Sequence, residues 1–392
     1  MTNLKKIRYV IFLKDVLILA LTCIGGPQAH IAMFLKKLVH DRAYLSEKEL
    51  LELQGLCSVL PGPTSTQTIT AIGYKIGGRN LSYITLLVWI SPACILMSVL
   101  AFFLSAFNSV EVNNLMQFIK PMGVAFILYS ASSISLKHIQ SKTSLFLMLA
   151  ALVCGYAFKS PYMTPLVIFM GGILASTKYR RQNKIEKTAF NVDFTDLIVW
   201  GVFFVILIFI GSVTHSLPIR LFENFYRNGS FAFGGGHVLK PLLYNEFVEF
   251  KKYLSPEEFL SGVTLSEIVP GPTFSIASYV GVLSMRADGT MGQFLGALVA
   301  SLGIFLPGIF MIFFAIKFWD NLKQYRGIRA SLEGINAATI GLTFAAGFSL
   351  FIPICTDNKS IFTVLITILL LYVQKIPSYA IILGGLVLGY LF

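Results

Sequence analysis

The sequence predicts an all-α polytopic membrane protein with two inverted-topology repeats, each combining broken or re-entrant helices with spanning helices. The first observation behind this prediction is composition: the 392 residues are 55% hydrophobic and only 13% charged, with a mean hydropathy of +0.74. A soluble domain carries about 25% charged residues. The second is a Pro-Gly-Pro motif that occurs twice, at residues 61–63 and 270–272, inside apolar segments. Interruptions at corresponding positions of two halves are typical of secondary transporters.

Three motifs recur in the same order at a constant separation of 209 residues. The first copy is Gly25-Gly26-Pro27, Tyr44-Leu45-Ser46 and Pro61-Gly62-Pro63-Thr64, and the second is Gly234-Gly235-Gly236, Tyr253-Leu254-Ser255 and Pro270-Gly271-Pro272-Thr273. Because broken backbone at membrane depth must be buried in protein or line a cavity, we expect interior breaks. The expected domains are an N-terminal repeat at 1–177 and a C-terminal repeat at 217–392. Between them, 178–216 holds a basic linker and a topology-inverting helix.

The apolar runs define the expected elements. Five runs are long enough to span about 30 Å of hydrocarbon, at residues 81–107, 115–134, 197–213, 294–316 and 331–354. Shorter runs at 144–158 with 161–176, and at 361–374 with 377–392, predict two helical hairpins. The motifs interrupt four further segments, at 9–35, 50–74, 217–250 and 259–283. Both a double re-entrant arrangement and a simple crossing by one interrupted segment fit the sequence.

The cations predict the orientation, because Lys and Arg near helix ends favour the cytoplasmic side. The basic residues at 5–8 place the N-terminus in the cytoplasm, and the basic run at 178–187 places the linker there. Residues 108–114 contain no base and are expected outside. The corresponding loop of the second copy, at 317–329, is basic and is expected inside. The halves are therefore predicted to be inverted, with the C-terminus external.

The net charge of +12 follows from this orientation and from contact with anionic lipid, and it does not indicate nucleic-acid binding. No A-x-A-like site follows the first apolar run, so we expect no cleaved signal peptide. The expected location is the cell (inner) membrane. A homodimer is compatible with the sequence.

The Pro-Gly-Pro motifs predict a site for an anion. Proline suits the first turn of a helix, so half-helices are expected to begin near Pro63 and Pro272. Their first N–H groups lack intrahelical partners and carry the positive end of the helix dipole. Two such ends meeting from opposite faces would bind an anion without a buried cation. The alternative is that each motif is a structural kink.

The candidate binding residues are those around the four breaks. Hydroxyl donors suit a tetrahedral, sulfate-like oxyanion, and the glycines allow close approach of the backbone. The candidates are Gly25, Gly26, Pro27, Pro61, Gly62, Pro63, Thr64, Ser65, Thr66, Gln67, Gly234, Gly235, Gly236, Pro270, Gly271, Pro272, Thr273, Ser275 and Lys120. Lys120 is expected about 7 Å inside its helix, where it either serves the site or extends to the interface.

Three further side chains are candidates for proton coupling. Glu267, three residues before Pro270, could carry a proton if it is buried beside an anion, or it could be an exposed carboxylate at a loop edge. His30 and His237 flank the glycine breaks and are either proton carriers or packing residues. Lys240 could attract the anion or face a loop.

Other chemistries have no support in the sequence. The five cysteines lie in apolar context without a C-x-x-C motif and are expected to pack as small hydrophobes. There is no H-E-x-x-H, Walker A, G-x-G-x-x-G or nucleophile-elbow motif. We therefore expect no metal, no cofactor, no ATP-driven pumping and no enzyme.

Four segments together resemble the signatures of the chromate ion transporter family in its long, two-domain form. They are residues 25–31, 60–67, 233–236 and 269–274. The resemblance implies a transporter of chromate linked to the proton-motive force, in bacteria usually an exporter. Sulfate or another oxyanion is the alternative substrate, and a lipid-phosphate translocase is the alternative of a different class.

The chain departs from the family pattern near the proposed site. Ser58 and Glu267 stand where the family commonly has Gln, and His237 and Lys240 replace Tyr or Gln and an aliphatic residue. Pro92 and Pro307 keep the family's proline in the following helix. These changes alter the charge beside the site, so they bear on the substrate rather than on the fold.

Overall fold

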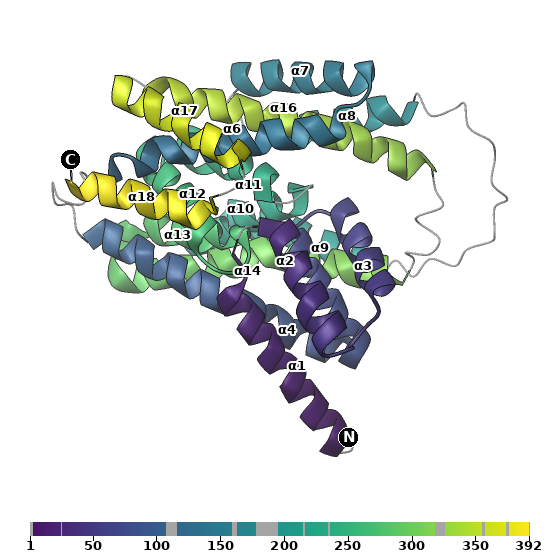
Figure 1. Ribbon diagram of the computed structural model, residues 1–392. Helices are drawn as coiled ribbons and strands as arrows, with labels where there is room; N and C mark the ends of the chain where they lie inside the picture. Colours follow the sequence, from purple (N-terminus) through teal and green to yellow (C-terminus); the bar gives the residue numbers. More distant parts are fainter. Residues whose placement is uncertain are drawn as a thin grey trace.

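A computed structural model describes residues 3–24, 26–106, 116–158, 163–177, 195–214, 216–233, 236–317, 326–354, 357–373 and 376–391. These residues form helices and turns, apart from one isolated bridge between two residues (Figure 1). Four helical stretches in the described part are long and apolar enough to cross a membrane: Thr64–Ala106, Ile119–Leu136, Arg286–Ile316 and Glu333–Ile354. Shorter apolar helices accompany them. The prediction of an all-α membrane protein is confirmed.

The first half follows the predicted order of elements. It contains α1 (Asn3–Thr22), α2 (Gly26–Phe34), the π-helix η1 (Leu35–Asp41), α3 (Glu47–Val59), α4 (Thr64–Ala106), α6 (Ile119–His138), α7 (Lys142–Ala157) and α8 (Met163–Thr177). The two interrupted segments break where the glycine and Pro-Gly-Pro motifs stand, and α7 and α8 form the predicted hairpin. The basic linker at 178–194 lies outside the described residues.

After α9 (Thr195–Thr214), the second half repeats this order. It contains α10 (Leu217–Phe231), α11 (Gly236–Leu243), the π-helix η3 (Tyr244–Phe250), α12 (Pro256–Ile268), the 3₁₀ turn η4 (Thr273–Ser275), α13 (Ile276–Ser284), η5 (Arg286–Asp288), α14 (Gly289–Ile316), α16 (Arg326–Ile354), α17 (Asn358–Val373) and α18 (Ser378–Leu391). The second hairpin, α17 with α18, is found as predicted.

The repeat extends to details of the backbone. Both halves place a π-helix after the first break, and the two π-helices begin 209 residues apart. Both then form a capping box, in which Ser46 or Ser255 accepts a hydrogen bond from the N–H of the Glu three residues later and that Glu accepts from the Ser N–H. Ala43 and Lys252, just before these boxes, both have positive φ. The two copies therefore share local structure as well as motifs.

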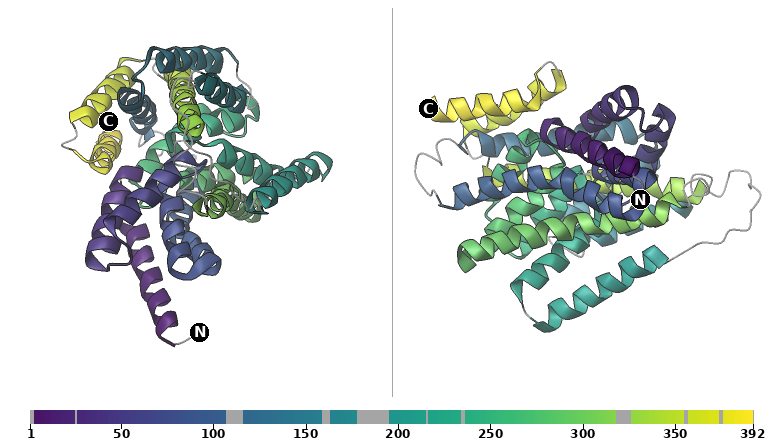
Figure 2. Two further views of the ribbon diagram at one scale, coloured as in Figure 1. Left: turned by 90° about the vertical axis from the view of Figure 1, so that its right-hand side faces the viewer. Right: turned by 90° about the horizontal axis from the view of Figure 1, so that it is seen from below.

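Corresponding long helices of the two halves run antiparallel. Near the end of α4, Ser105 accepts a hydrogen bond of 2.9 Å from Gln293, near the start of α14. Arg79, just after the kink of α4 at Gly77 and Gly78, and Lys317, at the end of α14, both bind the carboxylate of Asp196 at the start of α9, with nitrogen–oxygen distances of 2.8 and 2.9 Å. The two helices lie side by side (Figure 2). Within this pair of neighbouring helices, α4 and α14 therefore run in opposite directions.

Helices of the upper layer in Figure 1 pack through glycines. A Cβ on Gly334 of α16 would lie 2.0 Å from the carbonyl oxygen of Gly171 in α8. A Cβ on Gly341 of α16 would lie 2.1 Å from the carbonyl oxygen of Met148 in α7. Small residues that let helix backbones touch are characteristic of helix packing in membranes. This packing fixes the first hairpin to the long helix of the second half.

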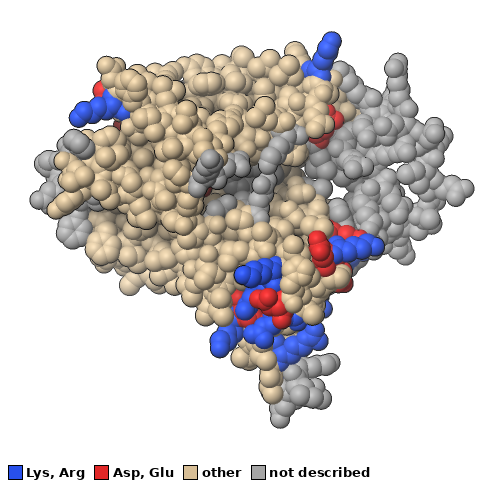
Figure 3. All heavy atoms as spheres, viewed as in Figure 1, with Lys and Arg blue, Asp and Glu red and all other residues tan. Residues whose placement is uncertain are grey.

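The surface has the distribution of polarity that a bilayer requires. Most of the face in Figure 3 carries no charge, and the charged side chains gather over its lower part, with a few at the edges. Large apolar side chains are exposed on helices such as α9, α17 and α18, including Phe209, Leu369 and Leu391. Apolar exposure of this extent is suited to contact with lipid.

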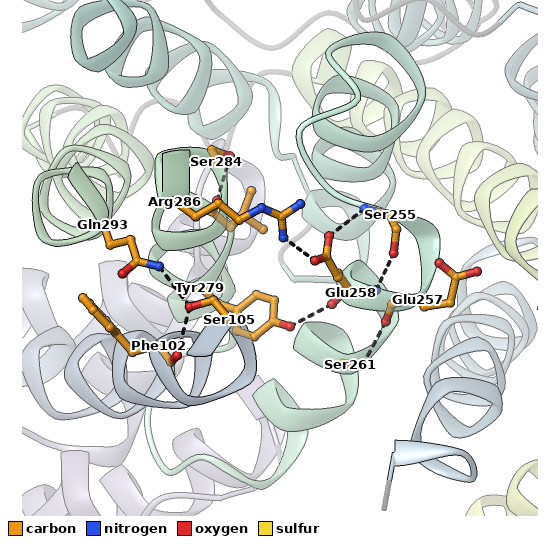
Figure 4. Close-up of polar contacts among 11 residues, drawn as sticks. Phe102, Ser105, Ser255, Glu257, Glu258, Ser261, Tyr279, Ser284, Arg286 and Gln293 are labelled. Carbon is orange, nitrogen blue, oxygen red and sulfur yellow. Dashed lines mark hydrogen bonds and ion pairs between the residues drawn. The ribbon is translucent and has the colours of Figure 1, made fainter. Parts of the chain in front are cut away.

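Each half also carries an ion pair at its capping box. Lys75 binds Glu49 at 3.2 Å, and Arg286 binds Glu258 in the second half, where Tyr279 also donates to the Glu258 carbonyl (Figure 4). The hydrogen bonds from the Ser46 backbone and hydroxyl, together with the Lys75 charge, lower the pKa of Glu49 to about 2. These pairs hold the end of the half-helix against the helix that precedes the Pro-Gly-Pro turn.

In each half an ion pair with a buried carboxylate joins the π-helix or the residue after it to the helix before the first break, and the acid and the base are exchanged between the halves. In the first half Asp15, which is 1% exposed, binds Arg42 at 2.9 Å and Lys37 at 3.7 Å. In the second half Arg227 binds Glu246 at 3.0 Å, and Glu246 is 0% exposed. Lys37 and Glu246 occupy corresponding positions in the repeat. The position on the π-helix is kept while its charge is reversed, and the partner on the preceding helix changes from Asp15 to Arg227, whose counterpart is Ile18.

Three details differ from the sequence-based expectations. Lys120 is the second residue of α6, not a full turn inside it, because the helix begins at Ile119 with Pro121 in its first turn. The second half-helix starts with the short turn η4 before the α-helix continues. The first half-helix and the following spanning helix join into α4 across a kink at Gly77 and Gly78.

Candidate functional site

The Pro-Gly-Pro turns meet the broken segments of the opposite halves. The Gly62 N–H donates to the Ala232 carbonyl at 2.9 Å, and the Gly271 N–H donates to the Cys23 carbonyl at 2.8 Å. Cys23 and Ala232 are themselves 209 residues apart, as are Gly62 and Gly271. Each Pro-Gly-Pro turn thus donates to the broken segment of the other half, and the two hydrogen bonds join corresponding pairs of residues. Such reciprocal contacts are typical of a two-fold arrangement. All four residues are buried, so the breaks meet in the interior.

Glycine is required at the centre of both turns. Gly62 has a φ of +119° and Gly271 a φ of +105°, which L-residues rarely adopt. A Cβ on Gly271 would also lie 2.9 Å from the Cβ of Ala93, and a Cβ on Gly62 would lie 3.3 Å from the Cα of Gly308. Ala93 and Gly308 each follow the proline of the next long helix. Each turn therefore packs against the same place in the opposite half.

A polar cluster surrounds the start of α4. His30 Nδ1 lies 3.0 Å from Ser65 Oγ, and Trp89 donates its indole N–H to Thr66 Oγ1 at 3.1 Å. Gln67 donates to the carbonyls of Pro61 and Gly308, at 2.8 and 3.2 Å. These side chains are buried. The structure thus brings the candidates His30, Ser65, Thr66 and Gln67 together. Their side chains bond to each other, to Trp89 or to backbone carbonyls.

Thr64 and Thr273 differ from their neighbours. They are corresponding residues, each directly after its turn, and both are half-buried. Their hydroxyls form no hydrogen bond with any residue that the structure describes. Ser65 and Thr66, by contrast, are bonded to His30 and Trp89. Among the described residues, these two threonine hydroxyls are thus candidates to contact a ligand.

The second turn has an ion pair beside it. Lys240 of α11 binds Glu267 of α12, and the two side chains are 5% and 16% exposed. Helix α11 also packs against η4, the start of the second half-helix. Glu267 was expected as a lone buried acid or an exposed one, and the structure instead gives it a buried counter-charge.

The start of α6, where Lys120 stands, packs against α12, the helix that carries Glu267. The carbonyl of Ile119, the residue before it, accepts a hydrogen bond of 3.0 Å from Thr264, one helical turn before Glu267 in α12. Gly123, the next turn of α6, packs against Thr264 as well. The structure therefore places the first turns of α6, which include Lys120, against α12 one turn before Glu267, and His30 beside the start of the first half-helix.

Some candidates lie outside the described part of the chain. Gly25, Gly234 and Gly235 are not described, and neither are the side chains of Pro27 and His237. Gly26 and Gly236 are described as the first residues of α2 and α11. Ser275 is buried in η4, and Pro63 and Pro272 directly precede the two half-helices.

Two members of the site were missed in the sequence. Trp89 lies within an apolar run and gives no sign there that its N–H bonds to Thr66. Gly308 could have been found from the recurring prolines, because Pro92 and Pro307 mark the place where each turn packs. Among the described residues, no group of three or more His, Cys, Asp and Glu could hold a metal ion.

Comparison with known proteins adds independent information. The model of the chromate transporter family matches residues 11–176 and 219–390. An uncharacterized transporter of Methanocaldococcus jannaschii is 24% identical over 386 residues, which cover 95% of this chain and 92% of that protein. A chromate transport protein of Pseudomonas aeruginosa is 24% identical over 381 residues, covering 94% of this chain and 88% of that protein.

A shorter relative matches one half only. An uncharacterized transporter of Bacillus subtilis is 25% identical over 184 residues, which cover 45% of this chain and 99% of that protein. No solved structure matches the chain.

Proposed function

Because the chain belongs to the chromate transporter family, we propose that it is a secondary transporter of an oxyanion, with chromate as the leading substrate. The chromate transport proteins among its relatives support this substrate class. Transport runs out of the cytoplasm and is linked to the proton-motive force. Sulfate, which has the same shape and charge as chromate, is the alternative substrate.

The proposed site lies where the Pro-Gly-Pro turns meet the opposite halves. Its donors are the free N–H groups at the starts of the two half-helices and the hydroxyls of Thr64 and Thr273. The observation that carries this proposal is the reciprocal pair of hydrogen bonds from Gly62 and Gly271. The antiparallel course of α4 and α14 supports inverted repeats. The basic residues at positions 5–8 support a cytoplasmic N-terminus.

Uptake into inverted membrane vesicles tests the function. Labelled chromate and labelled sulfate are offered to vesicles containing the protein, with a membrane potential and a pH gradient imposed separately. We expect chromate to accumulate inside energised vesicles, because the cytoplasmic face of the protein is turned outward. Vesicles without the protein are the control. No flux of chromate under any of these conditions would refute the proposed substrate, and flux of sulfate alone would replace it.

Replacing the two available threonines by valine should weaken binding of the anion. A hydrogen bond to a charged group contributes about 1.5–3 kcal/mol, so each of Thr64→Val and Thr273→Val should raise KM about tenfold or more. The matched control is Thr70→Val, because the Thr70 hydroxyl bonds to the Thr66 carbonyl inside α4. Unchanged KM in both site variants would show that neither hydroxyl contacts the substrate.

A further inference from the structure

The ion pair beside the second turn has no equivalent in the first half. Lys240 corresponds to Ile31, and Glu267 corresponds to Ser58, so one half carries a charged pair where the other carries neutral side chains. The pair is nearly enclosed, with Lys240 5% and Glu267 16% exposed. Removing one partner of a buried pair leaves the other charge uncompensated, which is strongly unfavourable. A charge in this position needs a reason beyond holding the fold, because the same fold forms without it in the first half.

The pair is placed where an anion at the second half-helix would meet it. Glu267 lies in the last turn of α12, three residues before Pro270, and α11, which carries Lys240, packs against η4. An oxyanion bound at η4 would therefore lie on an element that packs against the helix of Lys240, whose ammonium group already binds the Glu267 carboxylate. The two anions compete for this ammonium group, because like charges brought together in a buried site repel.

We propose that Lys240 and Glu267 form an exchangeable pair that couples the oxyanion to a proton, a proposal that rests on the oxyanion transport proposed above. Without substrate, Glu267 neutralises Lys240. When the oxyanion arrives, it takes the ammonium group, and the released carboxylate binds one proton from water to become a neutral carboxylic acid. When the oxyanion leaves, that proton returns to water and the ion pair forms again.

The exchange has a consequence for the driving force. A dianion that moves together with one proton transfers one net negative charge. A membrane potential that is negative in the cytoplasm drives this charge outward, whereas a pH gradient that is acidic outside opposes the accompanying proton. The electrical part of the proton-motive force is therefore the part that powers efflux.

The charged groups around the pair do not replace either partner. Helix α11 packs against α6, α10, α16, η3 and η4, and α12 packs against α4, α6, α13, α18, η3 and η4. The acidic and basic side chains described on these elements are Lys75, Arg79, Lys120, His138, Arg220, Glu223, Arg227, Glu246, Glu249, Glu257, Glu258 and Glu333. Their tyrosines and cysteines are Tyr74, Tyr83, Cys94, Tyr129, Tyr226, Tyr244, Tyr279, Tyr379 and Tyr390.

Most of the carboxylates among these groups already have partners. Glu246 and Glu223 bind Arg227, Glu258 binds Arg286, Glu249 accepts from Tyr244 and Glu333 accepts from Ser141. Lys120 lies closest along α12 to Glu267, through the contact of Ile119 with Thr264. A lysine carries no carboxylate, so it cannot take the place of Glu267 as the group that binds the proton.

Calorimetric binding of chromate to the purified full-length protein tests the exchange. Titrations in two buffers with different ionisation enthalpies give the number of protons taken up per chromate. We expect the wild-type protein to take up about one proton more than Glu267→Gln, a difference that cancels any proton bound by chromate itself. Glu267→Gln should also bind chromate about tenfold more tightly or better, because no carboxylate competes for Lys240.

The first half supplies a matched variant. Lys240→Ile combined with Glu267→Ser introduces the residues found at the corresponding positions 31 and 58, so no charge is left buried. This variant should bind chromate more weakly than the wild type and should also lack the extra proton. It keeps the test decisive if Glu267→Gln does not fold.

The outcomes separate this inference from the proposed function. Binding of chromate by the wild type with the same proton uptake as both variants would overturn the exchange and leave the transport function standing. Binding by Glu267→Gln that is no tighter than in the wild type would also overturn it. A wild-type protein that binds neither chromate nor sulfate would overturn both proposals.

Discussion

Replacing Gly271 by alanine is expected to reduce transport more than about tenfold. The φ of +105° is strained for any L-residue, at a cost of about 1–3 kcal/mol, and the new methyl group would lie 2.9 Å from the Cβ of Ala93. To relieve the backbone strain and the crowding, the turn would have to move away from Cys23, whose carbonyl accepts a hydrogen bond from the Gly271 N–H. The measurement is chromate uptake into vesicles, normalised to the amount of folded protein.

Two variants sort out the cause of that effect. Gly78 has a φ of +74° with no atom within 4 Å of the position of a Cβ, so Gly78→Ala introduces strain without crowding and should retain more transport. Ala93→Gly in the Gly271→Ala background removes the crowding, and its counterpart Gly308 shows that glycine fits that place. We expect partial recovery in this double variant. Full transport by Gly271→Ala alone would mean that the geometry of the turn does not matter.

Arg227→Ala is expected to cost about 3–5 kcal/mol of folding stability, because it leaves the Glu246 carboxylate buried without its counter-charge. This loss is a large part of the stability of about 5–15 kcal/mol that is common for folded proteins. The measurement is the thermal unfolding of the purified protein in detergent, together with the yield of folded protein from the membrane.

A second substitution distinguishes charge from packing. In Arg227→Met with Glu246→Leu the fully buried Glu246 carboxylate is removed and only Glu223, which is 14% exposed, loses its partner, so we expect this double variant to be clearly more stable than Arg227→Ala. If the double variant were as unstable as the single one, lost packing rather than the unpaired carboxylate would be responsible. Lys37→Met in the first half should be milder, because Asp15 would still hold Arg42.

The helices could be predicted from the sequence because a bilayer imposes a simple rule on composition. Runs of apolar residues gave α9, α14 and both hairpins to within a few residues, and glycine with proline located the breaks. The family resemblance carried by the same motifs is confirmed by the match over both halves. Lys120 was placed too deep because apolar residues before Ile119 continue the run without continuing the helix.

The site could be predicted only in part, because its contacts connect distant residues. The motifs identified the turns, but the partner of Gly62 is a carbonyl of a residue without any distinguishing feature, Ala232. Lys240 and Glu267 were noticed separately, and their pairing depends on how α11 and α12 pack, which hydropathy does not encode. The binding of the anion at Thr64 and Thr273 stays a prediction.

The crossed hydrogen bonds of Gly62 and Gly271 also bear on how such a protein is assembled. In a polypeptide with one copy of the motifs, the N–H at the position of Gly62 and the carbonyl at the position of Cys23 would lack their hydrogen-bond partners, because those partners belong to the other copy. Such a polypeptide could satisfy these two groups only by associating with a second polypeptide. Joining both copies in one gene removes that encounter and guarantees a one-to-one ratio of the halves. It also lets the two copies differ, and in this chain only the second half carries charges at these positions, Lys240 and Glu267.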